Sequence, residues 1–218
     1  MRRITWLFAI LLVPALAEAQ ASEASFPHWD FNVGVAQFNA NPDRHEAAYD
    51  DWYATGRVAT SIGYYWSENL RTEIEYANTG EGTIFLQEFI RLPNGQSYPV
   101  SLEEAHHLQQ AAIRVVWQFF DNRWVHPYVN VGAVVDINRR QYDLAGAYYP
   151  VDPRIVPPQI VRDRYPSGSV VDYGAGVSYG GGVKFFVSQK AYLNTGMQFT
   201  YGDRFKTAAF LAGFGFEF

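Results

Sequence analysis

The chain has 218 residues, of which 17% are aromatic, and a formal net charge of −5 at pH 7. An acidic chain lacks the excess of basic residues by which proteins bind nucleic acid, so nucleic-acid binding is excluded as a function class. The absence of cysteine excludes disulfides, thiolate metal sites and lipid attachment through an N-terminal cysteine.

The first 19 residues have the features of a secretory signal peptide. A basic pair at residues 2–3 precedes an apolar run at 4–13, and the Ala-Glu-Ala sequence at 17–19 has the small-x-small pattern of a cleavage site. The apolar run is too short to span a bilayer as a helix. We therefore expect residues 1–19 to be removed during export and residues 20–218 to form a single domain.

From residue 29 onward, apolar residues alternate with polar or small ones, which is the period of a β-strand. In the last segment, for example, Phe210, Phe214 and Phe218 share one parity and Glu217 has the other. The sequence predicts eight such strands, at 29–38, 54–66, 70–78, 107–119, 125–137, 172–187, 191–201 and 206–218. Because no predicted helix covers their apolar faces, we expect lipid to cover them.

The predicted connections alternate in length. Long connections at 39–53, 79–106 and 138–171 alternate with short turns at 67–69, 120–124 and 188–190. Outer-membrane barrels have short periplasmic turns and longer outer loops, and closure pairs every backbone N–H and C=O in lipid. The predicted fold is therefore an all-β, eight-stranded antiparallel up-and-down transmembrane β-barrel with both termini in the periplasm.

The connection at 79–106 leaves details of the fold open. Ile84–Leu92 could extend the preceding hairpin beyond the membrane, or Ile84–Arg91 could pair within the membrane as an additional strand. Leu102–His107 could form a helical turn.

Several segments resemble the small outer-membrane β-barrel family, which includes OmpA-like transmembrane domains and OmpX-like and OmpW-like proteins. They are GYYWSENLRTEIEY at 63–76, HPYVNVGA at 126–133 and YGGGVKFFVSQKAYLNTGMQF at 179–199, together with the terminal Phe218. The resemblance covers essentially the mature chain and implies a location in the cell outer membrane. It also implies that Phe218 is the signal read by the barrel-assembly machinery. We expect the peptidoglycan-binding domain of the larger OmpA-like members to be absent.

The inward parity of the predicted strands carries charges of nearly balanced sign. They are Asp30, Arg57, Arg71, Glu73, Glu75, Arg114, Asp136, Lys184 and Glu217. The interior of an eight-stranded barrel is just wide enough for side chains to fill, and buried charges must be paired to offset desolvation. Since Glu73 and Glu75 would lie beside Arg114 on the next strand, we favour a lumen plugged by ion pairs. A narrow ion path with these three residues at its constriction is the alternative.

The predicted connection at 138–171 contains candidate binding residues for the cell surface, namely Arg139, Arg140, Arg154, Arg162 and Arg164. Arginine suits phosphate contacts, so these residues could bind lipopolysaccharide or a surface partner. A mobile loop in which nearby aspartates balance the charge fits the sequence equally well.

Two pairs of neighbouring residues raise the question of a metal site: His106 with His107, and Glu103 with Glu104. Histidine and carboxylate are suitable ligands, but adjacent histidines on an extended chain point in opposite directions. A solvated loop is the favoured interpretation, and no metal or cofactor is expected.

A lipid-modifying barrel enzyme would need a Ser or Tyr nucleophile with a His base at the outer rim. No His lies within a predicted strand beside a Ser, so no catalytic residue is assigned. The expected role is non-enzymatic, either structural or in contact with outer-membrane lipids and lipopolysaccharide. A small pore or carrier for small or hydrophobic solutes is the second hypothesis, and a lipid-modifying enzyme the third. The sequence does not give the oligomeric state.

Overall fold

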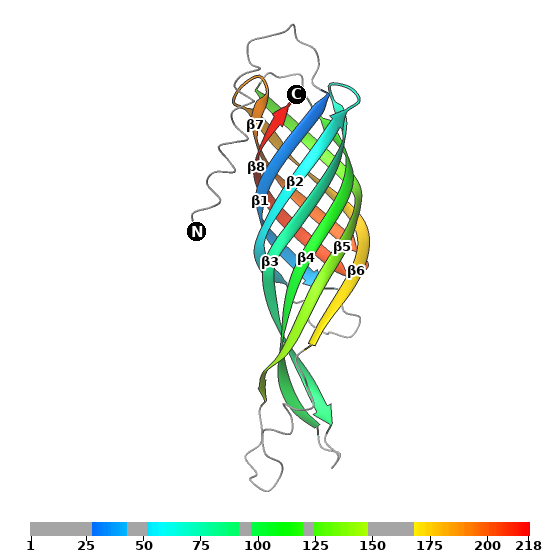
Figure 1. Cartoon of the computed structure of the whole chain (residues 1–218), viewed down its shortest axis with the longest axis vertical. Coiled ribbons are helices and arrows are strands. Elements are labelled where there is room, and N and C mark those ends of the chain that lie inside the picture. The colour runs from blue at the N-terminus through cyan, green and yellow to red at the C-terminus, as the bar shows by residue number, and fades with distance from the viewer. Residues whose placement is uncertain (1–27, 43–51, 92–96, 120–123, 148–167) are drawn as a thin grey trace.

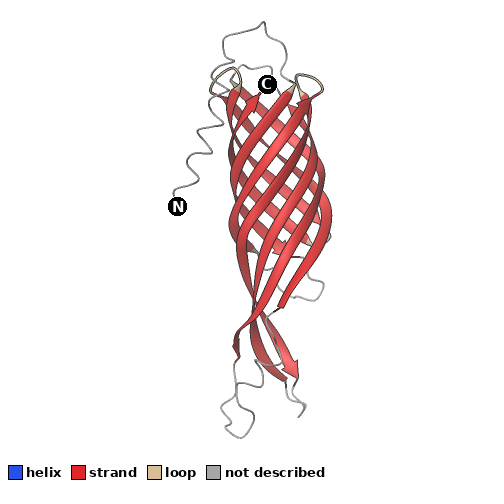
Figure 2. Ribbon diagram, viewed as in Figure 1, coloured by secondary structure: helices blue, strands red, loops and turns tan. Residues whose placement is uncertain are grey.

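A computed structural model describes residues 28–42, 52–91, 97–119, 124–147 and 168–218. The strands are β1 (Trp29–Pro42), β2 (Tyr53–Tyr65), β3 (Leu70–Arg91), β4 (Ser97–Gln118), β5 (Val125–Ala147), β6 (Gly168–Phe186), β7 (Ala191–Gly202) and β8 (Phe205–Glu217). Each strand pairs antiparallel with its neighbours in sequence, and β1 also pairs with β8, so the sheet closes (Figures 1 and 2). The predicted eight-stranded antiparallel barrel is confirmed. Within the described ranges, no helix is long and apolar enough to cross a membrane.

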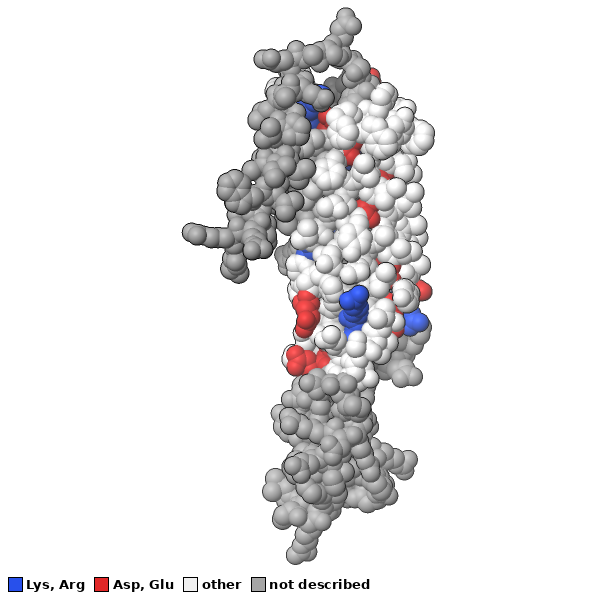
Figure 3. Space-filling model, in the orientation of Figure 1, with Lys and Arg blue, Asp and Glu red and all other residues white. Residues whose placement is uncertain are grey.

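The outer wall of the barrel is apolar. Ile74, Val131 and Val135 are each more than half exposed, whereas their neighbours Glu75 and Val134 are buried. Most of the outer surface in Figure 3 is free of charge, and the most prominent charged side chains lie toward its lower end. Of the exposed tryptophans in the described residues, four lie near the end with the short turns, namely Trp29, Trp66, Trp117 and Trp124, and Trp52 immediately precedes β2. Such an apolar surface with interfacial aromatics is typical of contact with a bilayer.

The closing pair of strands joins the two ends of the folded chain. Asp30 lies opposite Glu217, and Pro42 lies opposite Phe205. The amides of Trp29 and Phe218 each donate to the other residue's carbonyl oxygen, at 2.9 Å. The terminal strand is therefore one side of the closure, and its polar parity faces the lumen.

Inward-facing glycines line part of the wall and lie opposite one another in neighbouring strands. Gly182 pairs with Gly196, and Gly176 pairs with Gly202. A Cβ atom at Gly182 would lie 2.2 Å from the carbonyl oxygen of Thr195. Only glycine allows two backbones to lie this close together. Paired glycines also let the barrel wall bend at positions where no side chain is needed.

The two ends of the barrel differ. The turns at 66–69 and 187–190 and the chain's C-terminus lie at one end, which is the periplasmic end by the rule for outer-membrane barrels (Figure 1). At the other end, β3, β4 and β5 continue as an extension. Pairing of β2 with β3 stops at Arg57 and Thr79, whereas pairing of β3 with β4 continues to Arg91 and Ser97.

The extension decides the details left open by the sequence. Residues 84–91 continue β3, so the prediction that they extend the hairpin is confirmed and the additional membrane strand is wrong. The predicted helical turn at 102–107 is also wrong, because this segment belongs to β4 and pairs on both sides, with β3 and β5. A register shift between Asn78 and Glu81 marks the point where β3 leaves β2.

Candidate functional site

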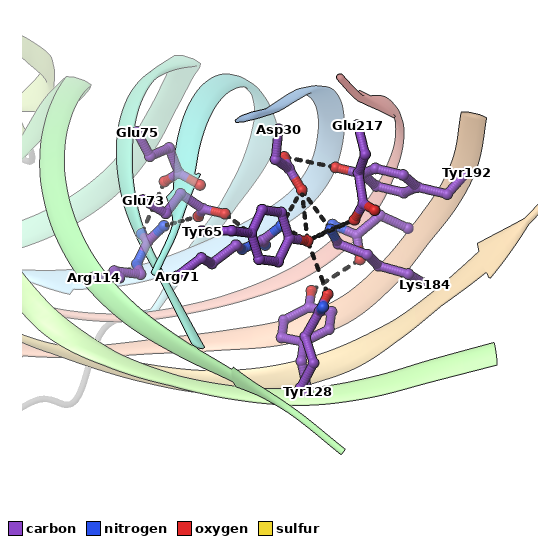
Figure 4. A network of polar contacts seen from close by, with 12 residues as sticks. Asp30, Tyr65, Arg71, Glu73, Glu75, Arg114, Tyr128, Lys184, Tyr192 and Glu217 are labelled. Carbon is purple, nitrogen blue, oxygen red and sulfur yellow. Dashed lines mark hydrogen bonds and ion pairs between the residues drawn. The ribbon is translucent and has the colours of Figure 1, made fainter. Parts of the chain in front are cut away.

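The charged side chains of the lumen form two groups near the periplasmic half of the barrel (Figure 4). We call Asp30, Tyr65, Arg71, Lys184, Tyr192 and Glu217 the periplasmic cluster, and Arg57, Glu73, Glu75 and Arg114 the central cluster. All of them are buried, and the charged side chains in their ion pairs are 11% exposed or less. Every strand except β5 contributes a residue.

In the periplasmic cluster, the Lys184 ammonium on β6 reaches across the lumen to the closing strands. It pairs with the Asp30 carboxylate on β1 and donates to Glu217 Oε1 on β8 at 2.8 Å. Asp30 and Glu217 are register partners, so their like charges would repel without a shared cation. Arg71 on β3 also pairs with Asp30.

Two tyrosines complete the hydrogen bonding of this cluster. The Tyr65 hydroxyl accepts from Lys184 Nζ at 2.8 Å and donates to Glu217 Oε1 at 2.5 Å. The Tyr192 hydroxyl donates to Asp30 Oδ1 at 2.8 Å, and its ring lies 4.2 Å from Lys184 Nζ, a cation–π contact.

The central cluster is set by the register of β3 and β4, which places Glu73 directly opposite Arg114. Arg114 Nη2 donates to Glu75 Oε1 at 2.9 Å, and its Nη1 reaches Glu73 Oε1 at 3.5 Å. Arg57 on β2 also pairs with Glu75. Arg71 Nη2 donates to Glu73 Oε2 at 2.8 Å and so links the two clusters.

Four carboxylates and four cations are therefore paired in one network. Desolvation costs several kcal/mol for each buried ion, and only close partners offset it. The network ties strands together across the lumen.

Asp136, which the sequence grouped with these charges, lies elsewhere in the lumen. Its Oδ1 accepts from Gln110 Nε2 at 2.8 Å, and the described residues place no cation in an ion pair with it. An amide partner therefore takes the place of the expected ion pair.

The extracellular half of the lumen holds an apolar group that sequence reasoning missed. We call it the extracellular cluster, and its buried members are Ala36, Phe38, Ala40, Tyr53, Ile84, Leu108, Phe205 and Ala209. It was missed in part because Ala40, Tyr53 and Ile84 lie in segments assigned to loops, whereas four other members lie within predicted strands, namely Ala36, Phe38, Leu108 and Ala209. The signal was present in the inward parity of residues 36, 38 and 40, which continues that of Asp30.

The solvated-loop interpretation of His106 is wrong. His106 is 1% exposed, faces the lumen from β4, and its ring stacks on that of Tyr53 with 5.3 Å between centroids. Its Nδ1 lies 3.2 Å from Asn138 Nδ2, and its Nε2 lies 3.9 Å from Glu104 Oε2. His107 has the opposite parity, as expected. The described part of the chain contains no group of three or more His, Cys, Asp or Glu placed to hold a metal ion.

Two of the predicted loop arginines lie on a strand, because β5 keeps its pairing with β6 as far as Tyr142. Arg139 faces outward and is exposed. Arg140 has the inward parity and pairs with Glu104 at 3.1 Å and Asp172 at 3.5 Å. Arg154, Arg162 and Arg164 lie outside the described residues.

The cavity beside the central cluster has a volume of about 20 Å³. Its lining includes Glu73, Glu75 and Arg114 together with Asn130 and Gln198. This volume suits about one water molecule. It is far too small for a nutrient or metabolite.

The sequence matches the family described as outer membrane protein beta-barrel domain over residues 8–218. No curated protein sequence matches the chain. Among solved structures, Ail of Yersinia pestis aligns with a TM-score of 0.51 at 12% identity over 89% of this chain and 100% of that one. Neisserial surface protein A aligns with a TM-score of 0.51 at 17% identity over 90% and 100%. Ail in complex with the heparin analogue sucrose octasulfate aligns at 0.50, with 13% identity over 89% and 100%. At these identities the likeness shows the fold alone.

Proposed function

Because the chain belongs to the outer membrane protein β-barrel domain family, we propose that it is an integral outer-membrane protein with a closed lumen, whose function is carried by its extracellular surface. The observation that carries this proposal is the network of four carboxylates and four cations, which joins strands across the lumen. The apolar extracellular cluster packs side chains into the other half. A pore or carrier would need a continuous path along the lumen that passes both groups of side chains.

The extracellular surface supports an interaction role. A groove of about 510 Å³ lies outside the barrel wall, lined by outward-facing side chains that include Glu81, Glu103 and Gln141. Arg139 is close by, since it pairs in register with His107, which pairs with Glu81. An exposed guanidinium at this level suits the phosphates of lipopolysaccharide, and Arg154, Arg162 and Arg164 are further candidates.

The structural relatives supply one further support. Ail is named an attachment invasion locus protein and has been crystallised with a heparin analogue. An interaction role at the cell surface, with the barrel as its membrane anchor, is consistent with this relative.

The role is non-enzymatic. His106 is a buried histidine in a strand, but an amide, a carboxylate and two aromatic rings surround it in the described residues. Residues 1–19 serve as the export signal in this account, and Phe218 as the signal for the barrel-assembly machinery.

A solute-uptake assay tests the closed lumen. Vesicles containing the refolded protein should swell in small sugars no faster than protein-free vesicles. Swelling faster than the protein-free rate contradicts the proposal and favours a pore.

A second assay tests the surface role. Lipopolysaccharide in the outer leaflet of asymmetric vesicles should raise the unfolding temperature of the wild type, and the rise should be smaller in Arg139→Ala. Lys190→Ala, which removes an exposed cation from a periplasmic turn, is the matched control and should keep the full rise. An equal rise in unfolding temperature in the wild type and both variants would show that Arg139 does not contact lipopolysaccharide.

A further inference from the structure

Three buried side-chain atoms around the small lumen cavity have no partner within the protein. They are the carbonyl oxygens of Asn32 and Asn130 and the amide nitrogen of Gln198. All three residues line the same cavity of about 20 Å³. A buried polar group without a hydrogen bond is costly, so three at one place indicate a missing partner rather than chance.

The register explains why there is space at this point. Asn130 on β5 and Gln198 on β7 are both paired with Gly180 on β6, which lies between them. All three have the inward parity, so the two amides flank the space that the glycine leaves bare. The Asn32 oxygen lies 2.9 Å from the position of a Cβ atom on Gly213, another bare point of the wall.

The chemistry of the three atoms selects the occupant. Two are acceptors and one is a donor, which complements a water molecule that donates twice and accepts once. A cation would be repelled by the Arg114 guanidinium and the Gln198 N–H group, and an anion by Glu73 and Glu75. The volume fits about one water molecule with two to four polar partners.

We propose that Asn32, Asn130 and Gln198 hold a bound water molecule in the lumen, in the cavity beside the central cluster. The proposal takes the closed lumen of the proposed function as its premise. Its test involves neither solute uptake nor lipopolysaccharide, so the bound water and the proposed function can fail separately.

The position of this water links its exchange with solvent to opening of the lumen. On β1, Asn32 lies between Asp30 of the periplasmic cluster and Phe38 of the extracellular cluster. We expect exchange of the water with solvent to require separation of one of these groups, so that its residence time reports how often the lumen opens.

The test is water–protein NMR on the wild-type protein in lipid nanodiscs. Cross-peaks between water and the side-chain amide protons of Gln198, with a sign that indicates long residence, are the expected result. Their absence overturns the proposal, and because the wild type is used, the result does not depend on the folding of a variant.

A stability comparison gives a second, independent readout. If the cavity is dry, Gln198 carries an unsatisfied amide and Gln198→Met should melt at a higher temperature than the wild type; this outcome overturns the proposal. If water is bound, Gln198→Met should melt no higher, since the amide was already satisfied. Gln110→Met is the matched control, because Gln110 donates to Asp136 and its loss should lower the melting temperature in either case.

Discussion

Replacing Lys184 by Met should destabilise the barrel at its closure. The substitution keeps an unbranched side chain that is one atom shorter, and it removes the ammonium that contacts both Asp30 on β1 and Glu217 on β8. Asp30 would keep Arg71, but Glu217 would keep only the Tyr65 hydroxyl. Removing one partner of a buried ion pair costs about 3–5 kcal/mol, because the remaining charge stays buried.

That cost corresponds to a loss of roughly 10²-fold to several thousand-fold in the folding equilibrium. It can be measured by urea titration of folding into lipid vesicles, followed by tryptophan fluorescence and by the mobility of unheated samples on gels. Lys190→Met, in an exposed periplasmic turn, is the matched control and should leave the midpoint unchanged.

A double variant separates charge from packing. Adding Glu217→Gln to Lys184→Met should recover part of the lost stability, because it removes the carboxylate that has no cation, and the coupling energy should be about 0.5–3 kcal/mol. A loss below about 1 kcal/mol in Lys184→Met, or no recovery in the double variant, would refute the reasoning that this lysine compensates the two closing carboxylates.

Two further substitutions test the wall and the extracellular cluster. Gly182→Val should prevent folding, because a Cβ atom at residue 182 would lie 2.2 Å from the Thr195 carbonyl oxygen. A Cβ atom at Gly56 would meet nothing within 4 Å, so Gly56→Ala should fold normally. Equal folding yields of the two variants in vesicles would contradict the account of the inward-facing glycines. Phe38→Ala should lower the free energy of unfolding by about 3–5 kcal/mol in the same urea titration, as large-to-small substitutions of buried aromatic residues do. A decrease below about 1 kcal/mol would show that the extracellular cluster is loosely packed.

Strand parity made much of the barrel predictable. Phe210 and Glu217 lie at positions of opposite parity in the same strand, and this parity predicts which side chains face lipid and which face the lumen. Gly80 and Gly82 interrupt the same alternation, and glycine commonly ends regular structure, which favours a loop over a strand for residues 79–106. In the structure, these glycines lie where β3 shifts its register and passes from the barrel into the extension.

The contacts inside the lumen were less predictable, for a geometric reason. Glu73 and Arg114 are neighbours on adjacent strands, so their proximity follows from order along the chain. The contact of Lys184 with Asp30 joins residues 154 positions apart across the lumen, and it depends on strand tilt and stagger that alternation does not contain. His106 could have been placed by extending the parity of Arg114 upstream, and the loop assignment prevented that step.

The closed lumen is tested most directly by single-channel recording of the refolded protein in planar bilayers, with the wild type, Glu73→Ala and Arg114→Ala. The account predicts no conductance steps from the wild type, together with lowered thermal stability in both variants, because each leaves two buried partner charges with one ion pair fewer. Regular steps from the wild type, with an ion selectivity that changes in the two variants, would contradict it and would make the central cluster the constriction of a channel.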